Sequence, residues 1–170
     1  MIYKKNLVFL GMMGSGKSSI GYLVSKKLNL IFTDIDNLIE EKTGMCVSDI
    51  FNKKGEDYFR DLEEKITLKT LKNSNEIVSL GGGGFINEQI RKEVLANHVS
   101  FWLNCDESVL LKRIKSNKKR PLALKLTDQE IKHLNKKRSK IYSKANFKIN
   151  CSKLTKTEIV KKIIKIYADN

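Results

Sequence analysis

One segment, residues 11–18, constrains the fold of this chain more than any other. It reads Gly-Met-Met-Gly-Ser-Gly-Lys-Ser and fits the phosphate-binding pattern G-x-x-x-x-G-K-[ST]. An apolar run at residues 7–10 precedes it and a helix-like pattern follows, so its N–H groups can point at phosphate oxygens. In this pattern Lys17 reaches the β/γ-phosphates and the Ser18 hydroxyl ligates Mg²⁺. We therefore predict that a nucleoside triphosphate binds here, and the residues predicted to contact it are Gly14, Ser15, Gly16, Lys17, Ser18 and Ser19.

Short apolar runs alternate with helix-like patterns along the chain. Further strand candidates lie at residues 31–32, 77–80, 99–103 and 147–149. Apolar stripes at helical spacing lie between them, made by Ile20, Leu23, Val24 and Leu28, by Phe59, Leu62 and Ile66, and by Ile159, Val160, Ile163, Ile164 and Tyr167. Capping boxes at Thr127 and Thr155 each mark the start of a helix. This order predicts a single α/β domain over residues 1–170 with a mostly parallel sheet, whose ligands bind in a crevice at the carboxyl ends of the strands.

The composition excludes several classes of protein. The net charge is +14, but 28 of the 33 basic residues are lysines spread along the chain, so we expect no specific nucleic-acid partner. No apolar run approaches the roughly 20 residues of a membrane span, and we expect a cytoplasmic protein. Three widely spaced cysteines, Cys46, Cys105 and Cys151, predict small buried apolar side chains rather than a disulfide framework.

Two carboxylates follow the second strand candidate, in the segment Asp34-Ile35-Asp36. In an extended segment residues two apart face the same side, so both carboxylates can enter the crevice. One can then face the metal and the other an acceptor hydroxyl. The alternative is that Asp36 caps a helix at residues 37–42.

Two arginines and a run of glycines are further candidates. Arg60 lies beside an apolar stripe and Arg138 lies late on a helix, and each has the alternative of a solvated surface arginine. In a chain so rich in lysine, an arginine suggests a need for the planar two-pronged donor. Residues 81–84 are all glycine, which predicts that a substrate approaches the backbone closely, and a tight strand-to-helix turn is the alternative.

Residues 117–126 lack apolar periodicity and read as a loop that contains Arg120 and Pro121. Such a loop beside a phosphate site can act as a lid, with Arg120 stabilising the transferring charge. The alternative is a plain basic loop. The chain carries no guanine-reading Asn/Thr-Lys-x-Asp motif and is short for an added motor domain, so we favour a compact kinase.

Together these motifs resemble the shikimate kinase family. The resemblance rests on the phosphate loop, Asp-x-Asp, Gly-Glu-x-x-Phe-Arg-x-x-Glu at residues 55–63, the glycines at 81–83, Arg-Pro-Leu at 120–122, and Arg138 with Tyr142. It implies transfer of the γ-phosphate of ATP to the 3-hydroxyl of shikimate, in the pathway to chorismate and the aromatic amino acids. It also implies the three-layer fold of nucleoside monophosphate kinases, in which helices cover both faces of a five-stranded parallel sheet of order 2-3-1-4-5.

The resemblance also implies roles for particular residues. Asp36 holds the acceptor hydroxyls, Arg60 and Arg138 bind the shikimate carboxylate, and Gly81, Gly82 and Gly83 line that substrate. Ser18 and Asp34 serve Mg²⁺, the catalytic residues are Asp36, Lys17 and Arg120, and Arg113 lies against the adenine. Arg91 matches no motif and is expected at the surface, and Lys140 stands where many relatives have proline, which favours a straighter helix.

Two other functions stay open. Another small kinase of the same fold, such as a gluconate kinase, shares the phosphate loop but does not need two arginines and three glycines in these places. A phosphate-loop protein that binds nucleic acid through its basic surface is the alternative from another class. A complete α/β core favours a monomer.

Overall fold

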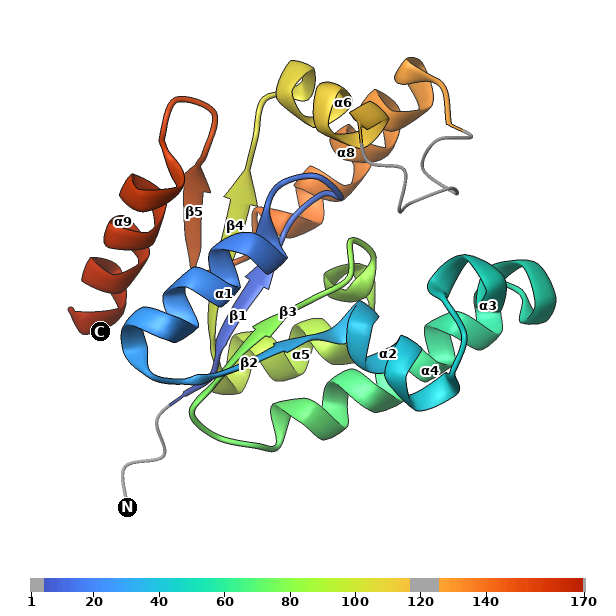
Figure 1. The fold of residues 1–170 in the computed structure, drawn as a ribbon, viewed down its shortest axis with the longest axis horizontal. Coiled ribbons are helices and arrows are strands. Elements are labelled where there is room, and N and C mark those ends of the chain that lie inside the picture. Colours follow the sequence, from blue (N-terminus) through green and yellow to red (C-terminus); the bar gives the residue numbers. More distant parts are fainter. Residues whose placement is uncertain (1–4, 117–125, 170) are drawn as a thin grey trace.

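A computed structural model describes residues 5–116 and 126–169. Within these ranges five parallel strands form one sheet in the order β2-β3-β1-β4-β5 (Figure 1). The strands are β1 (Leu7–Leu10), β2 (Ile31–Asp34), β3 (Glu76–Ser79), β4 (Val99–Asn104) and β5 (Phe147–Asn150). The predicted strand positions, their parallel pairing and their order are confirmed.

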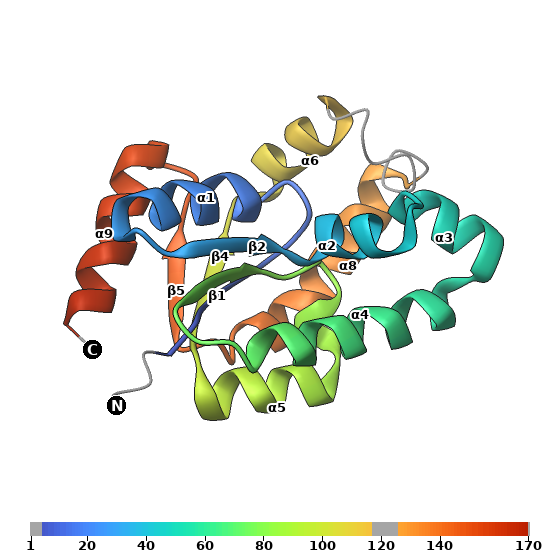
Figure 2. The same ribbon diagram turned by 60° about the horizontal axis from the view of Figure 1, so that its bottom comes forward.

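Helices cover both faces of this sheet (Figure 2). They are α1 (Lys17–Leu28), α2 (Ile35–Thr43), α3 (Val47–Lys54), α4 (Glu56–Leu71), α5 (Glu88–Asn97), α6 (Glu107–Ser116), α8 (Asp128–Tyr142) and α9 (Lys156–Ala168), with a 3₁₀ turn η1 (Gly84–Ile86) after β3. Helices α1 and α9 pack together on one face, and α4 and α5 on the other. The predicted three layers are therefore present.

The strand sequences explain the layering. Every residue of β1 is fully buried, as expected for a continuous apolar strand in the centre of a sheet that is covered on both faces. Strand β2 lies at the edge and is only partly covered, so Ile31 remains 64% exposed. Phe101 stacks between Phe9 and Phe147 and joins three neighbouring strands.

The helix boundaries follow the local signals. The capping boxes at Thr127 and Thr155 are both formed, and they start α8 and α9. Helix α8 runs without interruption through Lys140 to Tyr142, as its sequence favours. Among the described residues, no helix is long and apolar enough to cross a membrane.

Two predictions about the core are wrong in part. Leu23 is exposed, because the side of α1 that faces the sheet is made by Ile20, Gly21 and Val24, with Gly21 against Phe32. Cys46 is exposed because it lies in the connection between α2 and α3, outside the sheet layers. The other two cysteines, Cys105 and Cys151, are buried as predicted.

Candidate active site

The phosphate loop joins β1 to α1 at the carboxyl end of the sheet. Gly11, Gly14 and Gly16 have φ values of 141°, 79° and 96°, which favour glycine and let the chain curl back on itself. Gly16 is the N-cap residue of α1, and no side chain hydrogen-bonds to the first N–H groups of that helix. These N–H groups are therefore available to an anion. Lys17 is buried, and its Nζ donates to the carbonyl oxygens of Gly11 at 2.9 Å and Met12 at 3.0 Å.

A cavity of about 360 Å³ lies beside this loop. It is lined by Gly14, Ser15, Gly16, Lys17, Ser18, Ser19, Ile20, Arg113, Cys151, Leu154, Lys156 and Ile159. All the residues predicted to bind the nucleotide that lie within the described ranges are among them. Lys156 and the apolar residues between β5 and α9 were not predicted, because no motif in the sequence links that segment to residues 11–18.

Ser18 and Asp34 meet at the side of the phosphate loop. The Ser18 hydroxyl donates to Asp34 Oδ2 at 2.5 Å, although 16 residues separate the two. A hydroxyl and a carboxylate are hard oxygen donors of the kind that Mg²⁺ accepts. The described residues contain no group of three or more His, Cys, Asp or Glu side chains placed to hold a metal.

The predicted geometry of the Asp34–Asp36 segment is wrong. Helix α2 begins at Ile35, so only Asp34 is extended, and the two carboxylates do not share a face by strand alternation. The helix cap is Asp34, whose Oδ1 accepts from the backbone N–H of Asn37 at 3.3 Å. Asp36 lies in the first helical turn and is turned toward the glycine loop, so the alternative that Asp36 is the cap is wrong too.

The glycine loop, residues 81–84 after β3, lies close to several charged side chains. A Cβ on Gly81 would lie 2.6 Å from Asp36 Oδ1 and 2.5 Å from Glu63 Oε1. A Cβ on Gly82 would lie 3.3 Å from Arg138 Nη1, and one on Gly83 would overlap the Arg60 guanidinium. These glycines do not have positive φ values, so close approach rather than backbone conformation explains them.

Arg60 is held by two carboxylates on its own helix. Its Nη1 donates to Glu63 at 2.7 Å and its Nη2 to Glu56 at 3.1 Å, and the guanidinium lies over the rings of Phe59 and Phe51. Burial opposes the charge, but the two carboxylates outweigh it and raise the pKa of Arg60. Arg60 is therefore not a freely solvated surface arginine.

Glu63 is the least exposed member of this cluster. Burial raises its pKa, and the neighbouring Arg60 opposes that shift. Its Oε2 accepts from Arg60, whereas its Oε1 has no hydrogen-bond partner and faces the glycine loop. Glu63 closes the Gly-Glu-x-x-Phe-Arg-x-x-Glu motif, but the motif alone predicts no role for it. Its position three residues after Arg60, on the same helical face, is the signal that could have revealed it.

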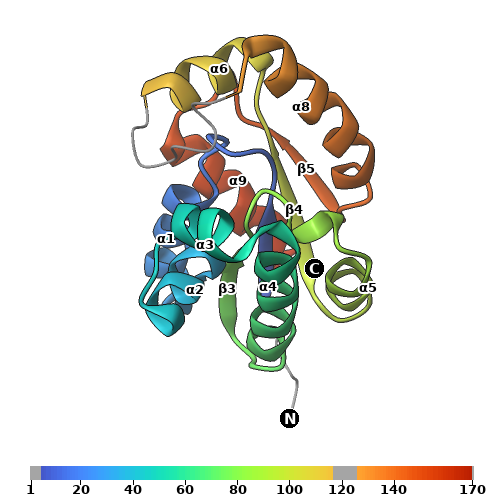
Figure 3. The same ribbon diagram turned by 90° about the vertical axis from the view of Figure 1, so that its right-hand side faces the viewer.

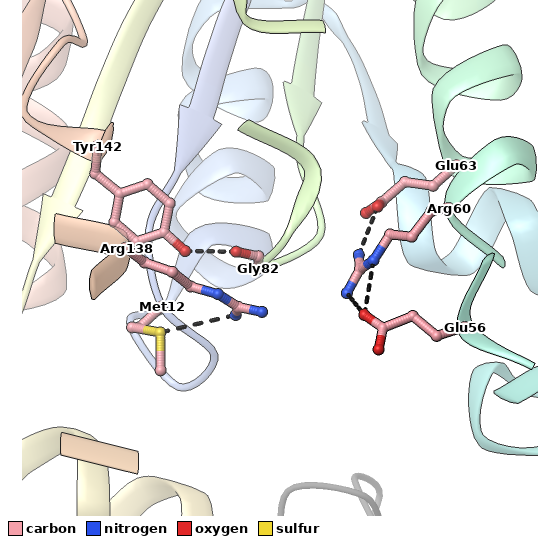
Figure 4. Close-up of polar contacts among 7 residues, drawn as sticks. All are labelled: Met12, Glu56, Arg60, Glu63, Gly82, Arg138 and Tyr142. Atoms are coloured by element: carbon pink, nitrogen blue, oxygen red, sulfur yellow. Dashed lines mark hydrogen bonds and ion pairs between the residues drawn. The ribbon is translucent and has the colours of Figure 1, made fainter. Parts of the chain in front are cut away.

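Arg138 and Tyr142 approach the loop from α8 (Figure 4). The Tyr142 hydroxyl donates to the carbonyl oxygen of Gly82 at 2.5 Å, and Tyr142 is 1% exposed. Arg138 contacts the Met12 sulfur at 3.9 Å, a weak acceptor. Burial raises the pKa of Tyr142 to about 12, with Arg138 acting against that shift. Figure 4 shows the guanidinium groups of Arg138 and Arg60 pointing toward one another from opposite sides.

Arg91 is not the surface residue that the sequence suggested. It is half-buried, and its Nη1 donates to the carbonyl oxygens of Phe85 at 3.2 Å and Ile86 at 2.8 Å. It therefore ties α5 to the turn that follows the glycine loop. A contact with carbonyl groups leaves no charge pattern in the sequence, so nothing there pointed to it.

Two other arginines, Arg113 and Arg120, were predicted to contact the nucleotide. Arg113 is exposed on α6, lines the cavity and donates to the carbonyl oxygen of Gly14 at 3.2 Å. Arg120 and most of the predicted lid at residues 117–126 lie outside the described residues. Seen from the side in Figure 3, α6 lies above the phosphate loop, and α2, α3 and α4 lie below it.

Comparison with known proteins agrees with this geometry. The sequence model of the shikimate kinase family matches residues 13–168. The shikimate kinase of Thermodesulfovibrio yellowstonii is 40% identical over 164 residues, which cover 96% of this chain and 95% of that protein. The enzyme of Sulfurihydrogenibium sp. is 42% identical over 160 residues, covering 94% of this chain and 96% of its own.

Solved structures give the same result. A structure of shikimate kinase from Acinetobacter baumannii in complex with shikimate has a TM-score of 0.92 at 27% identity, and the match covers 98% of this chain and 94% of that one. A gluconokinase from Sinorhizobium meliloti has a TM-score of 0.61 at 16% identity, with 98% and 93% covered, and shares the fold alone. On the sequence match, the fold and the arrangement of charged side chains around the glycine loop, this chain belongs to the shikimate kinase family.

Proposed function

We propose that this chain transfers the γ-phosphate of ATP to the 3-hydroxyl of shikimate, with the acceptor held at the glycine loop. The observation that carries the proposal is the approach of Asp36, Arg138 and Arg60 to three successive glycines, Gly81 to Gly83. A small ring with one carboxylate and three hydroxyls needs two cationic donors at one end and an acceptor at the other. The loop presents both kinds of group.

The two arginines are proposed to bind the shikimate carboxylate. They come from different helices, α4 and α8, and their guanidinium groups face one another (Figure 4). Each can give charge-assisted hydrogen bonds, worth about 1.5–3 kcal/mol net per bond to a charged group. Arg60 keeps its fork oriented by Glu63 and Glu56, so less conformational freedom is lost when the substrate binds.

Asp36 is proposed to orient the attacking hydroxyl. Its carboxylate lies against Gly81, and a Cβ on the next residue, Gly82, would lie 3.6 Å from the backbone nitrogen of Met13 in the phosphate loop. A carboxylate accepts hydrogen bonds from hydroxyls and can align one of them for in-line attack on phosphorus. Phosphoryl transfer depends mainly on positioning and charge stabilisation, so this alignment is the main contribution that we assign to Asp36.

The nucleotide is proposed to lie along the cavity beside the phosphate loop. Lys17 would exchange its carbonyl partners at Gly11 and Met12 for phosphate oxygens, and Arg113 would lie beside the base. Ser18 and Asp34 would hold Mg²⁺, which neutralises charge on the phosphates when bound. Arg120, the predicted lid, a monomeric state and a cytoplasmic location stay predictions.

The test is ADP release by the purified protein with ATP and Mg²⁺, in the presence of shikimate or of gluconate. We expect release that depends on shikimate, while gluconate gives only the background rate. Release driven by gluconate would contradict shikimate as the acceptor, and release independent of either acceptor would contradict the carboxylate clamp of Arg60 and Arg138 as well. The fold and the phosphate loop would stand in either case.

A further inference from the structure

Two cysteines follow neighbouring strands at the carboxyl end of the sheet. Strands β4 and β5 pair in parallel up to Asn104 opposite Asn150, and Cys105 and Cys151 come next on each strand. The backbone N–H of Cys151 still donates to the carbonyl oxygen of Asn104 at 2.8 Å, so the pairing continues to the cysteines. Paired strands lie about 4.8 Å apart, which is within the Cα separation of about 4.4–6.8 Å that a disulfide spans.

The side chains of this pair face the same way. One position earlier, Asn104 Nδ2 donates to Asn150 Oδ1 at 3.2 Å across the strands, which fixes the register of the side chains. The next pair therefore lies on the opposite face, where the Cys105 thiol reaches the carbonyl oxygen of Ser15 at 3.5 Å. The Cys151 thiol donates to the carbonyl oxygen of Ile149 at 3.3 Å and also interacts with the Cys105 sulfur.

The surroundings favour a thiolate at Cys105. The hydrogen bond from Cys151 and the nearby Arg113 lower the pKa of Cys105 to about 7, although burial acts against them. Arg113 Nη1 lies 3.8 Å from the Cys105 sulfur. The pKa of Cys151 is raised, because its thiol gives that hydrogen bond and is buried. One partner is thus the better nucleophile and the other a resolving thiol.

The pair also borders the nucleotide cavity. Cys151 lines that cavity together with the phosphate loop and Arg113. Both cysteines are otherwise buried, with 5% of Cys105 and 4% of Cys151 exposed to solvent. A small reagent that enters the cavity can therefore reach the pair, and a bound nucleotide would block the same path. The contacts of Cys105 with Ser15 and Arg113 connect the pair to two residues of the nucleotide site.

From this arrangement we propose that Cys105 and Cys151 are an oxidation site, at which a peroxide forms an internal disulfide that weakens nucleotide binding. The Cys105 thiolate attacks one peroxide oxygen, and the O–O bond breaks to give a sulfenic acid and hydroxide, which takes the Cys151 proton to become water. The Cys151 sulfur then attacks the sulfenic sulfur, forms the S–S bond, and expels hydroxide, which is protonated to water by solvent. In the overall reaction, two thiols and one hydrogen peroxide give one disulfide and two waters. The two thiols are oxidised by two electrons, and the peroxide is reduced by the same two electrons.

The expected effect on binding follows from the contacts that the disulfide removes. A bonded Cys105 can no longer donate to Ser15 or hold a negative charge beside Arg113. Loss of about one hydrogen bond corresponds to roughly a fivefold rise in the nucleotide Kd. A reductant such as dithiothreitol reverses the change.

The experiment uses Cys46→Ser, which leaves Cys105 and Cys151 as the two thiols of the chain. The protein is treated with hydrogen peroxide, unfolded, alkylated with iodoacetamide and weighed by mass spectrometry, and its ADP Kd is measured before and after. We expect both thiols to escape alkylation together, reversibly with dithiothreitol, more slowly when ADP is saturating, and with the rise in Kd. This readout needs no turnover of shikimate, so it fails or succeeds independently of the proposed function.

Matched controls are Cys105→Ala and Cys151→Ala in the same Cys46→Ser background. Each retains one thiol, so peroxide should give no internal disulfide, and reduction should restore no lost ADP affinity. Full alkylation of both thiols after peroxide treatment would overturn the oxidation site. A disulfide that forms without a change in ADP Kd would overturn the link to nucleotide binding, and one that forms equally fast with ADP bound would overturn entry through the cavity.

Discussion

The proposed nucleotide side and the proposed acceptor side of this site are built by different means. The nucleotide side is formed mainly by backbone groups, in a loop whose glycines have positive φ and at the start of a helix that begins at Lys17. On the acceptor side the backbone is ordinary, and side chains from α2, α4 and α8 converge on three glycines. A substitution of one side chain on the acceptor side is therefore expected to change acceptor binding and leave nucleotide binding largely unchanged.

The cations of the two sides also differ in what holds them before substrates arrive. Lys17 donates to neutral carbonyl oxygens of its own loop. Arg60 is paired with two carboxylates and lies over two aromatic rings. In the proposed complex, a phosphate would replace the neutral partners of Lys17 with charged ones, whereas Arg60 would keep Glu63 and use its remaining donors for the substrate. The acceptor side is thus organised in advance by charge pairs.

The largest effect is expected from Lys17→Met. This change removes the cation on the phosphates, and we expect turnover to fall by at least about 10²–10³-fold, the range found when one group that stabilises transition-state charge is deleted. The measurement is kcat with saturating shikimate, together with shikimate binding by calorimetry. Shikimate should still bind, and a variant that keeps normal turnover would contradict the phosphate-loop assignment.

Asp36→Asn should follow, with a loss of about 10²-fold in kcat, the lower end of the range for a group that accepts a proton, because an amide aligns a hydroxyl poorly and cannot accept its proton. ATP affinity should stay unchanged, since Asp36 faces the glycine loop rather than the cavity. Steady-state kinetics and ADP binding separate the two quantities. Activity close to that of the unaltered protein would remove Asp36 from the reaction.

Arg60→Lys should raise the KM for shikimate by about 10–100-fold and leave the KM for ATP unchanged. Lysine keeps the charge but cannot reproduce the fork that donates to Glu63 and to a carboxylate at once. The expected loss corresponds to about 1.5–3 kcal/mol, typical of a hydrogen bond to a charged group. An unchanged shikimate KM would show that Arg60 serves only its ion pairs on α4.

The smallest of these effects is expected from Tyr142→Phe. The change removes one buried hydrogen bond to the Gly82 carbonyl oxygen, so we expect the shikimate KM to rise about fivefold with little change in kcat. Thermal unfolding with and without shikimate provides a second readout. If the ATP KM rises instead, the bond supports the nucleotide side and the proposed division is wrong.

The fold could be predicted almost completely from the sequence, because the signals that determine its strands and helices lie within short segments of the chain. Continuous apolar strands, capping boxes and a phosphate loop between strand and helix are short-range signals, and the parallel order follows from the family resemblance. The helix start at Ile35 was missed, because the carboxylate of Asp34 caps the helix two residues earlier than expected.

In the candidate site, the sequence pointed only to residues whose type is unusual in this chain and suits a particular kind of contact. Arginines in a lysine-rich chain and a run of glycines pointed to Arg60, Arg138 and the glycine loop. The roles of Arg91 and Lys156 depend on packing between elements distant in sequence, so no local pattern marks them. Glu63 lay within a quoted motif, but its burial and its orphan oxygen need the structure.

The most direct test of the account is Gly83→Ala compared with Gly82→Ala. A Cβ at Gly83 overlaps the movable end of Arg60, whereas one at Gly82 lies 3.3 Å from Arg138. We predict that Gly83→Ala displaces the guanidinium, raises the shikimate KM by at least about tenfold, and leaves the ATP KM and thermal stability nearly unchanged, with a smaller effect for Gly82→Ala. An unaltered shikimate KM in Gly83→Ala, or an equal rise in the ATP KM, would contradict the claim that side chains around this loop form the acceptor site.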